Sequence, residues 1–203
     1  MLKVMQIAQD FYQAALDKHE TRIVNNILKM ESFEPIVNSQ PDRITNIAIV
    51  VPTLKRYAGG HTSILRIGTY LKENAYEVTY VSFHNQDIKQ MSRVAHDNFS
   101  EVKGKFAKYS DAINEHYDVC IATSWESVYW SKQLAGYKMY FVQDFEPYFF
   151  KLSERFLLAK KTYELGFHIV SLGGWNVKKI QEHCTINGKI SYIDFPYEPA
   201  EYK

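Results

Sequence analysis

The stretch that decides the fold is Asn46-Ile47-Ala48-Ile49-Val50-Val51-Pro52, which a short loop joins to Gly59-Gly60-His61-Thr62. The apolar run predicts a strand that is buried on both faces of a sheet. The glycine pair stands at the start of an amphipathic segment and is expected to open a helix. This order puts the start of a helix beside the carboxyl end of a strand, where open α/β sheets bind ligands. Glycine lets a ligand approach the backbone closely, and the free N–H groups favour an anion.

The same alternation of apolar runs and helical patterns continues along the chain. Further strands are expected at 78–83, 119–123, 137–142, 168–172 and 190–193. Helices are expected at 63–74, 109–116, 125–135, 152–165 and 175–184, and 84–108 as a helix followed by an irregular stretch. Gly136 and Gly166 are typical left-handed helix ends. With residues 47–51, six apolar strands alternate with helices, which predicts an α/β fold: a Rossmann-like, doubly wound parallel sheet.

Residues 1–45 precede this domain as a helix, 1–30, and an extended connector, 31–45. The apolar residues of the helix recur at three- and four-residue spacing: Ile7, Phe11, Ala14, Ala15, Ile23, Ile27 and Met30. We expect this stripe to pack on the domain that follows, and a membrane surface or a partner protein are the alternatives. The domain itself is expected to cover residues 46–195.

The composition excludes several function classes. The 203 residues carry 24 Lys and Arg against 23 Asp and Glu, so no basic surface favours nucleic acid. Cys120 and Cys184 have no metal-ligand spacing and fit a reduced compartment, with Cys120 expected as a buried free thiol. Residues 1–10 lack the apolar core of a signal peptide, and no run is long enough to span a bilayer. A soluble, cytoplasmic protein is expected.

The loops that follow the strands give the candidate site, because the carboxyl ends of parallel strands meet at one edge of the sheet. The densest of them is Gln143-Asp144-Phe145-Glu146-Pro147-Tyr148. Gln143 and Tyr148 are expected to hold a polyol by an amide contact and by a ring that covers an apolar sugar face. Asp144 or Glu146 is a candidate general base for an acceptor hydroxyl. A helix cap or a salt bridge is the alternative for each carboxylate.

The other loops supply further candidates. His61 either touches a substrate hydroxyl or phosphate or is a plain helix-start residue. His84 and Asn85 follow the second strand. Trp125 and Glu126 extend the sugar surface after residues 119–123, although Glu126 also favours a helix N-terminus. Gly173, Gly174 and Trp175 form either another ligand loop or a tight turn with Trp175 packed below it.

Several common motifs are missing from the sequence. The loop at Gly59-Gly60 has neither the G-x-G-x-x-G pattern nor the lysine of a P-loop, which argues against NAD and simple ATP chemistry. No G-x-S-x-G nucleophile elbow occurs, which argues against the commonest α/β hydrolases.

With these residues in order, the chain resembles the amino-terminal, acceptor-binding domain of GT-B glycosyltransferases. It is most similar to rhamnosyltransferases of the WsaF type, which act in bacterial surface-glycan and O-antigen assembly. The resemblance covers roughly residues 46–195 and rests on Ile49–Pro52, Gly59–Thr62 with Leu65-Arg66, Tyr140–Phe149, Tyr163, Gly166-Phe167-His168 and Gly173–Trp175. The segment 143–149 is the most specific part.

The resemblance implies a division of roles. Gly59, Gly60, His61 and Thr62 reach the phosphates of a dTDP- or UDP-linked donor sugar, while Asp144 and Glu146 line the side of a glycan or lipid-linked acceptor. The family needs no catalytic metal and no further cofactor. Residues 196–203 look like the start of an interdomain linker, so the donor-binding domain is expected in a further domain or a separate subunit. Alone, the chain is expected to have little activity, and contact with the inner face of the membrane is a possible setting.

A second function class stays open. The alternative is a non-catalytic module that binds a glycan or a nucleotide during polysaccharide assembly. That alternative predicts sugar binding without turnover, and no exposed apolar patch that awaits a second domain.

Overall fold

The computed structural model describes the backbone of residues 2–194 and the side chains of residues 12–194. Residue 195 and the predicted linker at 196–203 lie outside the described residues. The strands are β1 (Asn46–Val51), β2 (Glu77–Ser82), β3 (Lys105–Lys108), β4 (Val119–Ala122), β5 (Tyr137–Val142), β6 (His168–Leu172) and β7 (Ile190–Ile193). The helices are α1 (Leu2–Met30), α2 (Gly59–Glu73), α3 (Ile88–Asn98), α4 (Tyr109–Ala112), α5 (Trp125–Lys132), α6 (Glu154–Lys161) and α7 (Gly174–His183), with 3₁₀ turns η1 (Glu146–Phe149) and η2 (Thr162–Glu164).

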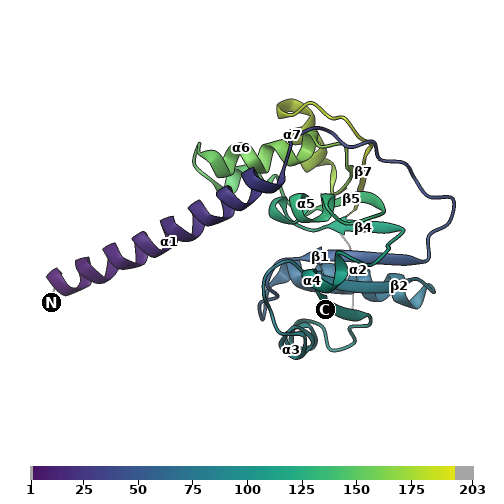
Figure 1. Cartoon of the computed structure of the whole chain (residues 1–203), viewed down its shortest axis with the longest axis horizontal. Coiled ribbons are helices and arrows are strands. Elements are labelled where there is room, and N and C mark those ends of the chain that lie inside the picture. The colour runs from purple at the N-terminus through teal and green to yellow at the C-terminus, as the bar shows by residue number, and fades with distance from the viewer. Residues whose placement is uncertain (1, 195–203) are drawn as a thin grey trace.

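All seven strands form one parallel sheet in the order β3-β2-β1-β4-β5-β6-β7 (Figure 1). The predicted α/β class with a parallel, Rossmann-like sheet is therefore confirmed. The central strand β1 pairs with β2 on one side and β4 on the other, so that Val50 lies between Val81 and Ala122. The chain moves outward from β1 to β3 and then returns to start again at β4. The direction of winding reverses between β1 and β4, which is the point where such sheets bind ligands.

One face of the sheet packs against α2 and α3. Ile47, Ile49 and Tyr80 of β1 and β2 share a buried cluster with Leu65 of α2 and Met91 of α3. Helix α2 approaches the sheet closely where it carries Gly68, because a Cβ at this position would lie 2.2 Å from the hydroxyl oxygen of Tyr80. That hydroxyl donates a hydrogen bond to the carbonyl oxygen of Leu65, one turn earlier in the helix, at 3.2 Å.

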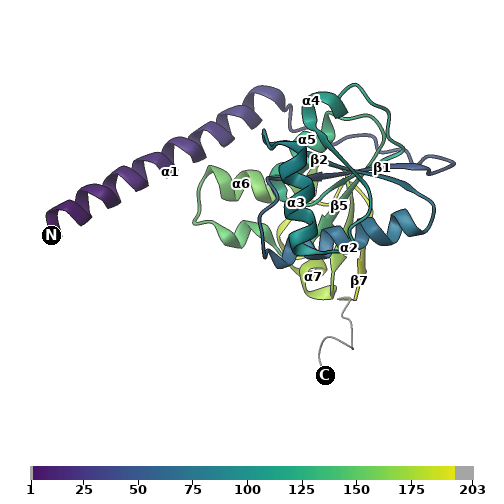
Figure 2. The ribbon, with the colours of Figure 1, turned by 90° about the horizontal axis from the view of Figure 1, so that it is seen from below.

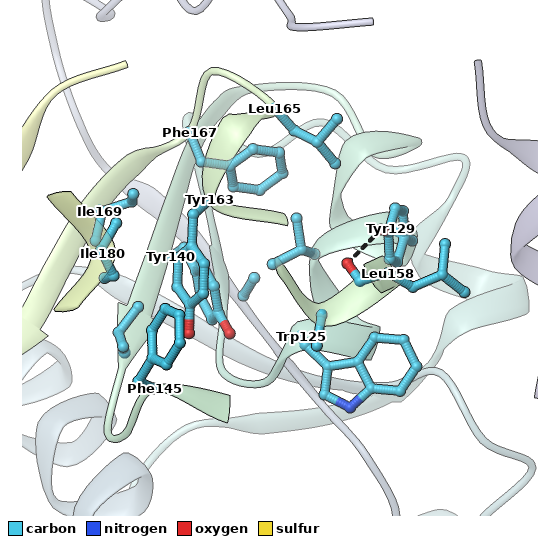
Figure 3. Packing of buried hydrophobic residues seen from close by; sticks show 14 of the residues in the cluster. Trp125, Tyr129, Tyr140, Phe145, Leu158, Tyr163, Leu165, Phe167, Ile169 and Ile180 are labelled. Atoms are coloured by element: carbon cyan, nitrogen blue, oxygen red, sulfur yellow. Dashed lines mark hydrogen bonds between the residues drawn. The ribbon is translucent and has the colours of Figure 1, made fainter. Parts of the chain in front are cut away.

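The opposite face is covered by the later helices. Tyr140 and Ile169 of β5 and β6 pack in one cluster with residues of α5, α6 and α7. The other buried aromatic residues of this cluster are Trp125, Tyr129, Phe145, Tyr163 and Phe167 (Figure 3). Helices therefore cover both faces of the sheet, as a doubly wound fold requires.

Coverage of the first face is incomplete. Beside α2, an apolar groove of about 370 Å³ runs across the strands that follow the reversal. It is lined by Ile121, Met139, Phe141, Val170 and Ile193 from the sheet and by Ile67 from α2, among others. Parallel sheets in α/β proteins normally have both faces buried. Among the described residues, this part of the sheet therefore exposes an apolar surface of the kind that another segment or protein normally covers.

Helix α1 projects from the body of the domain in both views (Figures 1 and 2). Near its C-terminal end Ile27 is buried in the core of α5 and α6, and Ile23 and Met30 pack partly against it. The predicted packing of the stripe is right there and wrong for Ala14 and Ala15, which are exposed. The side chains of Ile7 and Phe11 are not among those described. No described helix is long and apolar enough to cross a membrane.

The predicted elements differ from the structure mainly at their ends. The sequence missed β3, a four-residue edge strand with a lysine at each end and little apolar character, within the stretch predicted as a helix and an irregular segment. Helix α2 begins at Gly59, so the glycine pair forms its first turn. The predicted helix 152–165 is shorter, because Ser153 caps α6 and η2 continues as a 3₁₀ turn. Gly136 and Gly166 have positive φ angles of 105° and 84°. Gly166 follows the end of η2 as a left-handed stop, whereas α5 already ends at Lys132, so the prediction that this helix runs to Gly136 is wrong and Gly136 is the turn residue directly before β5.

The close contact at Gly68 gives a test of the fold. Alanine normally stabilises a helix interior relative to glycine, but in Gly68→Ala the new methyl group overlaps the Tyr80 ring. We expect a loss of about 1–3 kcal/mol in the free energy of unfolding, measured by denaturant titration. Gly174→Ala is the matched control, because a Cβ there meets nothing within 4 Å. Equal stability of the two variants would contradict the described packing of α2 on β2.

Candidate functional site

The candidate site lies along the edge of the sheet where the strands end. The loop after β1 reaches this edge first, and it is held by two side chains from elsewhere in the chain, Gln86 and Asn98. Gln86 forms two hydrogen bonds with the backbone of Leu54, at 2.9 and 3.1 Å. Asn98, at the end of α3, accepts from the N–H of Ala58 at 3.0 Å. The loop is thus fixed by hydrogen bonds before any ligand arrives.

His61 belongs to this loop system. Its Nδ1 accepts a hydrogen bond from the N–H of Lys55 at 3.1 Å, and burial lowers the pKa of the imidazole. The ring therefore closes the loop between β1 and α2. Thr62 bonds through its hydroxyl and its N–H to the carbonyl oxygen of Ala58, as the first turn of the helix. These contacts are the ones expected of residues at the start of a helix. A role of His61 or Thr62 at a phosphate stays a prediction.

The loops after β1 and β5 meet at Gly60. A Cβ at this position would lie 3.3 Å from Oε1 and 3.4 Å from Nε2 of Gln143, whereas a Cβ at Gly59 would meet nothing within 4 Å. Glycine at position 60 therefore lets the Gln143 amide lie against the start of α2. Two of the predicted site segments are side by side, although about eighty residues separate them in sequence.

Phe145 anchors the loop after β5. Its side chain is buried and stacks on Tyr163 with ring centroids 5.5 Å apart. The Tyr163 hydroxyl donates to the carbonyl oxygen of Asp144 and accepts from the N–H of Glu146, both at 3.3 Å. Asp144 itself points outward and is exposed, with one oxygen accepting from the N–H of Phe145 at 2.8 Å. Tyr163 therefore holds the backbone of both acidic residues, with Asp144 exposed to solvent and Glu146 turned toward the protein.

Glu146 connects this loop to the start of α5. Both of its carboxylate oxygens accept from the N–H of Trp125, at 3.0 and 3.1 Å, and Oε1 also accepts from the hydroxyl of Tyr140. Burial raises the pKa of the Glu146 carboxyl to about 7, while the bonds from Tyr140 and Trp125 oppose the shift. The group caps a helix, as one of the two sequence interpretations has it. The general-base role stays a prediction.

Glu126 is a second buried carboxylate in the same region. Its side chain is 16% exposed, and its Oε1 lies 3.9 Å from Nε2 of His84, the residue that follows Phe83 after β2. Burial raises the pKa of Glu126 to about 7, and the charge of Arg155 opposes that shift. Burial also lowers the pKa of His84. Arg155 stands over the ring of Phe150 at 4.2 Å and pairs with Glu20 of α1.

Aromatic rings stand exposed along the edge. Tyr57 at the tip of the first loop is 87% exposed, and Tyr148 and Trp175 are each 54% exposed. The Tyr148 hydroxyl lies 3.1 Å from Nε2 of His183. The exposed ring of Trp175 overturns the interpretation in which it packs below a tight turn. Gly173 has a positive φ of 73° and Gly174 opens α7, with free space above both.

Trp125 differs from these rings. Its indole is 5% exposed and packs edge-on against Tyr129 (Figure 3) and against Phe150. Contact between Trp125 and a sugar stays a prediction. In the structure the backbone N–H of Trp125 donates to the carboxylate of Glu146. Among residues 12–194, no group of three or more His, Cys, Asp and Glu side chains is placed to hold a metal ion.

Sequence reasoning left out Tyr140, Tyr163 and Arg155 as partners of the site. Their sequence signal is weak, because a tyrosine in an apolar strand or helix is normally core. Their roles come from contacts with the loop after β5 and with Glu126, and these contacts depend on how distant elements pack.

The two buried carboxyls generate a pH prediction. A carboxyl with a folded pKa of about 7 and an unfolded pKa near 4.5 binds its proton more tightly in the folded chain. The free energy of unfolding should therefore fall as pH rises through this window. Glu126→Gln should remove one such contribution and raise stability at pH 8 by about 1–3 kcal/mol, measured by denaturant titration across pH 4–8. The exposed Glu115→Gln is the control, and an unchanged pH slope in Glu126→Gln would contradict the burial of this carboxyl.

The contact between Gly60 and Gln143 generates a second prediction. Gly60→Ala should displace the Gln143 side chain by a few tenths of an ångström, at a small cost in stability. The side-chain amide resonances of Gln143 should shift in an NMR spectrum of this variant and stay in place in Gly59→Ala. Identical Gln143 resonances in both variants would mean that the two loops do not touch.

Comparison with known proteins gives one informative similarity. The chain is 40% identical over 68 residues to the O-antigen biosynthesis protein RfbC of Myxococcus xanthus. This match covers 32% of the chain and 5% of the relative, so the chain spans only a small part of that protein's length. No family model matches the chain.

Proposed function

We propose that the chain is the acceptor-binding half of a glycosyltransferase with a GT-B fold that acts in polysaccharide biosynthesis. The observation that carries this proposal is the similarity to the O-antigen biosynthesis protein, since O-antigen is a surface polysaccharide. The parallel sheet and the ligand-ready edge between β1 and β4 agree with it. Transfer of a rhamnosyl or related hexosyl group from a dTDP- or UDP-sugar is the finer form of the proposal.

The acceptor, a glycan or a lipid-linked saccharide, is proposed to lie along the loops after β4, β5 and β6. Gln143 and Asp144 offer an amide and a carboxylate to its hydroxyl groups. Tyr148 and Trp175, each about half exposed, offer aromatic faces of the kind that cover the apolar side of a sugar ring. Gly173 and Gly174 leave space for close approach above α7.

The donor phosphates are proposed to lie against the first turn of α2. The first N–H groups of a helix have no partner within the helix and favour an anion. Gly59 and Gly60 supply these groups without a Cβ, Thr62 stands in the same turn, and His61 fixes the preceding loop. The sugar ring would then face the side of the edge where Gln143 lies.

A donor-binding domain or subunit is the proposed partner. The apolar groove beside α2 supports this choice, because the alternative, a self-sufficient binding module, predicts that no such surface is left open. We infer that polypeptide from the partner covers the strands β4 to β7 where the helices among the described residues do not. This also explains why the isolated chain is expected to be inactive: the groups that stabilise the leaving nucleoside diphosphate belong to the partner.

A transfer assay tests the proposal. The chain is mixed with candidate donor-binding domains from the same reading frame or a neighbouring gene, and release of nucleoside diphosphate from dTDP- and UDP-sugars is followed with a glycan acceptor. We expect release only from the combination, and a decrease of tenfold or more in Gln143→Ala. Gln133→Ala is the matched control, because Gln133 follows the C-terminal end of α5, whereas the N-terminal end of this helix faces the site.

Two other outcomes would change the conclusion. Saturable glycan binding by calorimetry with no turnover beside any donor-binding partner would favour the non-catalytic module. Neither binding nor turnover would reject both forms of the proposal.

A further inference from the structure

His84 and Glu126 face each other without forming a direct hydrogen bond. The 3.9 Å between Nε2 of His84 and Oε1 of Glu126 is too long for a direct hydrogen bond. The side chains are 35% and 16% exposed, so the Glu126 carboxylate is largely removed from solvent, whereas the His84 ring is partly open to it. Within residues 12–194, neither the His84 ring nor the Glu126 carboxylate has a hydrogen-bond partner.

Such a gap has a definite size. Two polar atoms 3.9 Å apart can both lie about 2.8 Å from one oxygen atom placed between them. Largely buried polar groups are normally hydrogen-bonded, directly or through water or a ligand. The pair is therefore shaped for a single hydroxyl or water oxygen that donates to the carboxylate and bonds to the imidazole nitrogen.

The position of the pair is as informative as its spacing. His84 follows β2 and Glu126 follows β4, and β1 lies between these two strands in the sheet. The pair thus spans the end of β1, at the reversal point where ligands bind. Charged groups from three further elements act on it: Lys55 of the first loop and His19 of α1 on His84, and Arg155 of α6 on Glu126.

A second histidine–carboxylate pair, His116 and Asp118, has a similar spacing in a different setting. His116 and Asp118 lie 3.8 Å apart at the other edge of the sheet, before β4. The His116 side chain is 80% exposed. One oxygen of Asp118 accepts from the N–H groups of Thr45 and Asn46, at 2.7 and 2.9 Å. The oxygen that faces His116 is the other one, Oδ1, so a similar spacing also occurs at an exposed pair that lies away from the loops after the strands.

We propose that His84 and Glu126 bind the reacting hydroxyl of the saccharide acceptor and that Glu126 takes its proton during transfer. This inference rests on the proposed glycosyl transfer. The acceptor O–H proton moves to Oε1 of Glu126, and the freed electron pair of the oxygen forms the bond to the anomeric carbon of the donor sugar. The bond from that carbon to the nucleoside diphosphate breaks, and its electron pair leaves with the diphosphate.

The two buried glutamates at this edge then have separate roles. The oxygens of Glu146 are already engaged by Trp125 and Tyr140, so this residue holds the loop after β5. Glu126 has its hydrogen-bonding capacity open. Burial brings the pKa of Glu126 to about 7, which suits a general base that works near neutral pH.

The test separates binding from proton transfer in the complete enzyme, the chain with its donor-binding partner. Glu126→Gln keeps the shape and one acceptor oxygen but loses the basic carboxylate. We expect the turnover number to fall about 10²- to 10⁴-fold while the KM for the acceptor changes little. His84→Phe removes the bonding nitrogen and keeps a ring, so the acceptor KM should rise about tenfold. His116→Phe is the matched control and should change neither.

A second readout needs no turnover. Binding of methyl glycosides to the chain, followed by NMR, should persist in Glu126→Gln and weaken about tenfold in His84→Phe. Wild-type turnover and an unchanged pH profile in Glu126→Gln would overturn the role of Glu126 and leave the proposed function standing. If the wild-type chain neither binds glycosides nor supports transfer with any partner, the proposed function fails and this inference fails with it.

Discussion

The parallel pairing of β1 with both of its neighbours is the constraint on which the rest of the structure depends. Because β2 and β4 run in the same direction as β1, three loops that are distant in sequence end at one edge of the sheet. The first leads into α2 at Gly59 and Gly60, the second carries His84, and the third leads into α5, whose first turn holds Glu126. The reversal of winding between β1 and β4 keeps crossing helices away from this edge, so the loops can approach one another and a ligand.

The same residue type has two different situations at this edge. Glu126 and Glu146 are both buried, and burial raises the pKa of both to about 7. Glu146 is surrounded by donors and joins the loop after β5 to the first turn of α5. Glu126 lies 3.9 Å from His84, a separation that one oxygen atom can bridge. The chemistry available to each carboxylate is thus set by its hydrogen-bond partners more than by its burial.

The sequence predicts the sheet well, because apolar runs such as residues 47–51 and 137–142 are typical of central strands, and because Gly166 marks the end of the helical segment before β6. The sequence also predicts which loops meet at the carboxyl edge of the sheet, because that follows from the parallel order of the strands. It does not predict β3, whose lysines suit an exposed edge strand and break the apolar pattern. Nor does it reveal that His84 meets Glu126 or that Trp175 stands exposed, since these facts depend on how helices settle on the sheet.

The open groove beside α2 bears on how such a chain behaves in a cell. Its apolar lining gives a newly made chain a site for self-association, and that hazard grows with the concentration of copies that have no partner. A partner that binds only the folded chain shifts the equilibrium toward the folded form by mass action. If the proposed donor-binding polypeptide is that partner, its supply would govern how much of the chain persists, and balanced synthesis of the two polypeptides would be a condition of the chain's abundance.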